Sequence, residues 1–111
     1  MDKKFEVVFL DDAMEFLEKV DSKARKKIIY NITKSSYDND PKLFKKLTKS
    51  IWEFRTLYGK KQYRLLAFWD KRNKVNTLVV GTHGFIKKTQ KAPKSELKRA
   101  EDLMDNYFDN D

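Results

Sequence analysis

The sequence has no cysteine, a single histidine and no long apolar run. Without cysteine the chain can form neither a disulfide framework nor a thiolate metal site. One histidine without a cluster of carboxylates does not make a metal site either, so we expect no metal and no small-molecule cofactor. No apolar stretch approaches the roughly 20 residues of a membrane span, and the first residues lead into an alternating pattern, not an apolar signal core. We therefore expect a cytoplasmic protein without membrane contact, whose residues 1–111 form one domain.

Acidic residues are scarce in the middle of the chain. Residues 41–100 carry 17 Lys and Arg against three Asp and Glu, a net charge of +14. Residues 1–40 carry 8 against 9, and residues 101–111 carry no bases and five acids. The total of +8, with an isoelectric point of about 9.6, is typical of a nucleic-acid binder. Basic patches also bind acidic proteins and membrane surfaces, so charge alone does not choose among these partners.

The first half of the chain predicts one short strand followed by helical segments. The expected elements are a strand over Phe5–Leu10, a helix capped by Asp12 and Glu15, a second helix capped by Asp21 and Ser22, and a helical turn opened by Asp40 and Pro41 that runs through Leu43, Phe44 and Leu47. The simplest arrangement of the two longer helices is a hairpin.

From Ile51 the apolar pattern changes to a period of two, which indicates strands. The expected elements are a strand from Trp52 to Leu57, a turn at Gly59-Lys60-Lys61, a strand over Tyr63–Trp69, a hairpin over Asp70–Lys74 with Asn73 in a left-handed conformation, a strand over Val75–Thr82, and a last helix from Pro93. Short connections make neighbouring strands antiparallel. We predict an α+β fold in which an N-terminal helical hairpin packs on a small twisted antiparallel sheet, with a C-terminal helix.

A ligand site in such a fold would lie where the uncovered face of the sheet meets the segment after the last strand. Alternation places Arg55 on the same face as Glu53, opposite the aromatic residues of its strand. Arg64 lies on a strand with apolar residues on both faces, so its direction stays open. Each arginine could instead be a solvated strand residue or form an ion pair with Glu53.

His83 is placed at the expected end of a strand, and its ordinary pKa near neutrality suits proton transfer. A histidine that only makes a structural hydrogen bond is an equal alternative. Lys87, Lys88 and Lys91 crowd one short segment before a helix N-terminus, where they repel one another unless an anion lies between them.

Aromatic residues in the strand region are candidates for stacking on RNA bases, although core packing is the commoner role. These residues are Tyr58, Tyr63, Trp69 and Phe85. Among them, Tyr63 and Phe85 are the predicted RNA contacts, together with Lys91 and with Lys94 of the last helix.

Several of these motifs together resemble the HigB-like, phage-derived branch of the RelE/ParE toxin superfamily. They are Trp52-Glu53-Phe54-Arg55, Tyr63-Arg64, Phe85-x-Lys87-Lys88-x-x-Lys91-x-Pro93 and Glu96-x-x-x-Ala100. The match runs from about Leu47 to Tyr107. The resemblance implies a RelE-like fold and a toxin of a type II toxin-antitoxin system that cuts mRNA on the ribosome without a metal. It also implies a cognate antitoxin, often a small helix-turn-helix protein.

The resemblance implies roles for five residues. Arg55 and Arg64 match basic strand positions that contact phosphate, Lys87 and Lys88 match the basic positions after the last strand, and His83 or a lysine of lowered pKa would move protons. The RNA 2′-hydroxyl would attack the adjacent phosphate, and the cations would stabilise the developing charge.

The chain departs from the resembled pattern at two places. Ala92 stands where the branch commonly has threonine, and Tyr107 lies on the expected buried stripe of the last helix, so it receives no catalytic role. Two alternatives stay open: a ParE-like protein that poisons DNA gyrase, and an RNA-binding module without activity.

Overall fold

The computed structural model describes residues 2–110 as three helices and five strands. The elements are β1 (Glu6–Phe9), α1 (Asp11–Lys19), α2 (Ser22–Ser35), β2 (Phe44–Lys46), β3 (Trp52–Tyr58), β4 (Lys61–Asp70), β5 (Leu78–Lys87) and α3 (Lys94–Asp109). The strands form one sheet in the order β1-β5-β4-β3-β2. The α+β class is confirmed, but the sheet is mixed, because β1 runs parallel to β5 while the other pairs are antiparallel.

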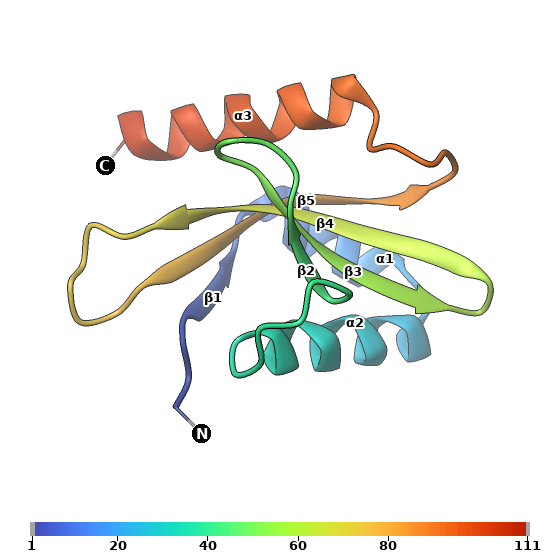
Figure 1. Ribbon diagram of the computed structural model, residues 1–111. Coiled ribbons are helices and arrows are strands. Elements are labelled where there is room, and N and C mark those ends of the chain that lie inside the picture. The colour runs from blue at the N-terminus through green and yellow to red at the C-terminus, as the bar shows by residue number, and fades with distance from the viewer. Residues whose placement is uncertain (1, 111) are drawn as a thin grey trace.

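Helices cover both faces of the sheet, so the protein has three layers (Figure 1). α1 packs over β5 and α2 packs over β3 on one face. Their buried apolar side chains form the larger core, which includes Ala13, Leu17, Ala24, Ile28, Ile32, Phe54, Leu65 and Val79. α3 crosses the other face, where Ala100 packs with Ile51, Leu66, Phe68 and Val80. The second face is therefore only partly open, contrary to the expectation that helices would cover one face.

The two N-terminal helices begin in different ways: α2 has a side-chain cap and α1 does not. Asp21 caps α2 as predicted, because its Oδ2 accepts a hydrogen bond from the backbone N–H of Ala24 at 3.1 Å. The predicted capping box of α1 is wrong, since Leu10 is the residue before the helix and Asp12 lies inside it. Asp12 instead accepts a hydrogen bond from Arg99 of α3 at 2.9 Å.

The turn between β3 and β4 is confirmed. Gly59 and Lys60 have φ angles of 57° and 65°, and Tyr58 pairs with Lys61 across the two-residue loop. Two successive left-handed residues are what a type I′ hairpin turn requires, and its twist matches that of the strands.

Three local predictions are wrong: pairing between strands decides two of these segments, and local hydrogen bonds to the Asn73 side chain decide the third. The segment predicted as a helical turn after Pro41 contains β2, where Phe44 stacks on Phe54 with ring centroids 4.3 Å apart. Asn73 is not left-handed, and its Oδ1 accepts hydrogen bonds from the N–H groups of Val75 and Asn76. The last strand runs over Leu78–Lys87 and not over residues 75–82.

An irregularity in the pairing of β4 with β5 changes which side chains share a face. Leu66 pairs with His83 and Ala67 pairs with Gly81, so Thr82 is an extra residue on β5. Val80 packs on the α3 side, and simple alternation would send His83 and Lys87 to the other face. The bulge reverses the alternation and places both on the α3 side.

Within residues 2–110 no helix is long and apolar enough to cross a membrane.

Candidate functional site

Basic side chains from four neighbouring strands gather on the α3 side of the sheet, beyond the end of the helix. Arg55 of β3 pairs directly with Arg64 of β4, and Gln62, two residues from Arg64, pairs with Lys87 of β5. Lys45 of β2 pairs with Glu53, two residues from Arg55. Because residues two apart and residues paired across strands share a face, all four cations point to the same side. We call Lys45, Arg55, Arg64 and Lys87 the basic cluster.

Glu53 lies buried between the two arginines of the cluster. Its Oε2 is 3.5 Å from Nε of Arg55 and its Oε1 is 3.4 Å from Nε of Arg64. The ion pair anticipated as an alternative is therefore present for both arginines. Glu53 is 3% exposed and Arg64 is 4% exposed, so the carboxylate stabilises a guanidinium that would otherwise be buried without a counter-charge. One carboxylate does not neutralise four cations, and the cluster keeps a positive excess.

Hydrogen bonds fix the position of Arg64. Its Nη1 donates to the carbonyl oxygen of Tyr63 at 3.2 Å, and its Nη2 donates to Oε1 of Gln62 at 2.6 Å. Burial lowers the pKa of Arg64, Glu53 raises it and Arg55 lowers it. A guanidinium has so high an ordinary pKa that Arg64 stays charged near neutrality. Arg55 is more accessible, with 29% of its side chain exposed, so it can meet a ligand directly.

Lys87 is the cluster residue suited to proton transfer. Burial lowers its pKa below the ordinary lysine value, and the positive charges of Arg64 and Arg55 lower it further, while Glu53 opposes them. An amine whose pKa moves toward neutrality can exchange a proton more readily at physiological pH than an ordinary lysine.

His83 does not reach the exposed surface of the cluster. It lies within β5, not at the strand end, and is 1% exposed beneath α3. Its Nε2 is 3.0 Å from Oε1 of Glu96, and its Nδ1 is 3.2 Å from Oγ1 of Thr82. Burial lowers the pKa of His83 although the Glu96 carboxylate raises it. Phe85 occupies the position between His83 and Lys87 on this face of the strand.

The other predicted residues lie around the cluster or in the core. Lys88 and Lys91 are exposed in the segment between β5 and α3, and Lys94 is the first residue of α3. Phe85 is half-buried against the α3 core. Tyr63 is buried in the core on the opposite face, so its ring is not available for base stacking in this structure. Tyr58 and Trp69 also pack against that core.

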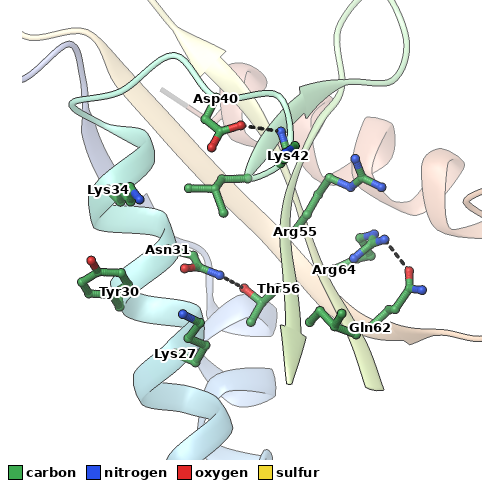
Figure 2. Close-up of a pocket in the computed structure, with 12 residues that line it drawn as sticks. Lys27, Tyr30, Asn31, Lys34, Asp40, Lys42, Arg55, Thr56, Gln62 and Arg64 are labelled. Atoms are coloured by element: carbon green, nitrogen blue, oxygen red, sulfur yellow. Dashed lines mark hydrogen bonds between the residues drawn. The ribbon is translucent and has the colours of Figure 1, made fainter. Parts of the chain in front are cut away.

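A cleft of about 500 Å³ lies beside the cluster, between α2 and β3. Lys27, Tyr30 and Lys34 line it from α2, and Arg55 and Arg64 line it from the sheet (Figure 2). Leu57 of β3 also lines it. We call it the α2–β3 cleft. Sequence reasoning missed its α2 residues and Lys45. The spacing of Lys27, Tyr30 and Lys34 places them on one face of a helix and was an available signal, whereas Lys45 was hidden by the incorrect helical turn.

Among residues 2–110, no three histidine, aspartate or glutamate side chains form a group that could hold a metal ion. The groups that the site offers to a ligand are guanidinium, ammonium, amide and aromatic groups. Guanidinium groups bind phosphate oxygens through two hydrogen bonds, and ammonium groups add positive charge. The arrangement can therefore hold a sugar-phosphate link and stabilise negative charge on it.

The chain is similar to a known protein family over most of its length. Residues 15–105 match the model of a family described as phage derived protein Gp49-like (DUF891). The matched segment includes the whole basic cluster and the α2–β3 cleft. No curated protein matches the chain.

Proposed function

Because this chain belongs to the family of phage-derived Gp49-like proteins, which is associated with toxins of the RelE and HigB type, we propose that it is the toxin of a type II toxin-antitoxin system. In this proposal it cleaves mRNA on the ribosome as a metal-independent endoribonuclease of the HigB-like branch. Its partners are ribosome-bound mRNA and a cognate antitoxin, a small helix-turn-helix protein, in the cytoplasm.

The observation that carries this proposal is the convergence of Arg55, Arg64 and Lys87 on one face of the sheet. Three strands bring these cations together, and Lys45 adds a fourth from β2. Like charges placed this close repel one another, and burial adds a further cost, so the arrangement favours binding of an anion. A phosphate diester would relieve the repulsion.

The chemistry assigns separate roles to the cations. The 2′-hydroxyl oxygen of the RNA forms a bond to the adjacent phosphorus, the bond from phosphorus to the 5′ oxygen breaks, and a cyclic phosphate and a 5′-hydroxyl result. Arg55 and Arg64 stabilise the charge that develops on the phosphoryl oxygens. The ammonium group of Lys87 gives its proton to the leaving 5′ oxygen, and water takes the proton of the 2′-hydroxyl.

His83 has a positioning role in this scheme. Its contact with Glu96 joins β5 to the first turns of α3. The segment that carries Lys88 and Lys91 lies between these two elements, so the contact limits where this segment can move. We assign proton transfer to Lys87 because it is less buried than His83 and lies in the cluster.

The proposal is tested by expressing the protein in a bacterium and mapping the 5′ ends of ribosome-bound messages. The wild type should stop growth and generate new ends that carry a 5′-hydroxyl. Lys87→Gln should reduce cleavage about a hundredfold or more, because one proton-transfer group of this kind contributes roughly 10² to 10⁴ in rate. The matched control is Lys74→Gln, which makes the same change at an exposed position outside the cluster.

Two results would contradict the nuclease proposal, and a third would contradict the role assigned to Lys87. Intact messages together with a DNA-damage response would indicate gyrase poisoning of the ParE kind. Normal growth with soluble protein and no antitoxin present would indicate a binding module without activity. Equal loss of cleavage in the Lys87 and Lys74 variants would show that only the overall charge matters.

A further inference from the structure

The α2–β3 cleft exists because the edge strand β2 is shorter than its neighbour. β2 pairs with Trp52, Glu53 and Phe54, and one further backbone hydrogen bond joins the N–H of Arg55 to the carbonyl oxygen of Leu43. Among residues 2–110, no strand lies beside the edge of β3 beyond Arg55. α2 packs under β3 at this point, and Asn31 anchors it through a 3.1 Å hydrogen bond to Oγ1 of Thr56 (Figure 2).

The walls of the cleft combine positive charge with exposed aromatic and apolar surface. Lys27 and Lys34 stand on either side of Tyr30 on α2. Tyr30 is 59% exposed, with the Lys27 ammonium 5.3 Å from the centre of its ring, and Leu57 at the edge of the sheet is 67% exposed. Large apolar side chains exposed next to lysines suit a ligand that has both a flat π-face and negative charge. An unpaired nucleotide has both features.

α2 covers one face of the sheet and the arginines point to the other, so the cleft reaches the basic cluster around the edge of β3, where Arg55 and Arg64 belong to both. A phosphate held by these arginines therefore has the cleft on one side. Its volume of about 500 Å³ leaves room for one base and its ribose. An acidic protein segment would satisfy the lysines, but the shared arginines and the aromatic wall favour a nucleic-acid strand.

We propose that the α2–β3 cleft binds the RNA nucleotide next to the phosphate held by the basic cluster. The base stacks on Tyr30, and Lys27 and Lys34 contact the following phosphate. This inference rests on the proposed function and adds to it a subsite outside the reacting centre.

The test measures binding of a fluorescent 2′-O-methyl hexanucleotide of mixed sequence, which cannot undergo 2′-hydroxyl attack. Tyr30→Ala should weaken binding about tenfold, the loss expected for one base-stacking contact, whereas Tyr30→Phe should bind like the wild type. Stabilisation of the protein by inorganic phosphate should be unchanged in both variants, because phosphate alone occupies only the cluster.

A second comparison uses neighbouring lysines on α2. Lys27 lines the cleft, whereas Lys26 is exposed on the same helix outside it. Lys27→Ala should lower the slope of log affinity against log salt concentration by about 0.7, the value for one contact to a single-stranded phosphate. Lys26→Ala should change the slope by less than half of that.

The outcomes separate this inference from the proposed function. One outcome is that Tyr30→Ala and Tyr30→Phe bind the hexanucleotide equally well while Arg55→Gln loses binding. That outcome would overturn the cleft assignment alone. Absence of hexanucleotide binding by the wild type would overturn this inference, whereas the proposed function would be overturned only by intact ribosome-bound messages in the expression test. A different outcome is that Tyr30→Ala weakens binding of a hexaglutamate peptide but not of the oligonucleotide. That outcome would assign the cleft to an acidic protein segment and overturn the RNA subsite.

Discussion

Replacing Glu53 by glutamine should make the protein less stable and at the same time improve its affinity for phosphate. Glu53 is the only carboxylate that forms ion pairs with the cluster within residues 2–110, and it contacts Arg55 and Arg64 at 3.5 and 3.4 Å. Glutamine keeps the size of the side chain but removes the charge. The two arginines then repel each other without compensation, and they also lose a competitor for phosphate oxygens.

The magnitude follows from the distances and the burial. At an effective dielectric constant of about 20, each contact contributes roughly 5 kcal/mol of attraction before desolvation is subtracted. Arg55 is partly exposed, so solvent screens its contact, and the buried pair with Arg64 dominates. Removing one partner of a buried ion pair costs about 3–5 kcal/mol. We take the lower value, about 3 kcal/mol, which corresponds to a fall in Tm on the order of 10 °C.

The assay is urea unfolding at neutral pH, repeated with increasing inorganic phosphate. Glu53→Gln should start with the lower midpoint and gain more from phosphate than the wild type, because an anion bound to the folded state stabilises it by mass action. Glu18→Gln is the matched control, since Glu18 is exposed on α1. An unchanged midpoint, or equal gains from phosphate in both proteins, would refute the view that Glu53 and phosphate compete for the same arginines.

Three further predictions concern positions outside the cluster. Asp70→Asn should lower the free energy of unfolding in urea by about 1–3 kcal/mol, because hydrogen bonds from Arg72 hold the pKa of this carboxyl well below its ordinary value of 3.8. The wild type should lose this stability as pH falls below about 3.8, and an equally steep loss of stability in the variant over this pH range would contradict the prediction. His83→Gln should flatten the loss of stability that the wild type shows as pH falls from about 6.5 toward the lowered pKa of the buried imidazole, and unchanged pH curves would contradict this. Gly84→Ala should lower the Tm by several degrees, because a Cβ there would collide with the ring of Phe16, and a Tm at or above the wild-type value would refute the collision.

Much of the local structure could be predicted from the sequence, because local chemistry decides it. Asp21 caps α2 by a hydrogen bond within three residues, and Gly59 permits the left-handed turn between β3 and β4. The alternation of Trp52 and Phe54 with Glu53 and Arg55 predicted the faces of β3 correctly. These features depend on neighbours in the chain and need no knowledge of distant segments.

The segments whose structure was predicted wrongly or left open depend on contacts with distant parts of the chain. Phe44 lies in a strand because it stacks on Phe54 and pairs with β3, although its local sequence suits a helical turn. The direction of Arg64 was open from its pattern, and its pairing with Arg55 of β3 places it on the α3 side of the sheet. His83 was expected at an accessible strand end but is covered by α3 and held by Glu96.

Two features follow from the order of residues alone: the excess of positive charge in residues 41–100 and the period of two that places Arg55 on the same face as Glu53. That Lys87 lies beside Arg64 depends instead on strand pairing, because the extra residue Thr82 reverses the alternation along β5. The physical reason is that a period of two fixes which residues of one strand share a face, whereas strand order, register and bulges depend on hydrogen bonds between segments far apart in the chain.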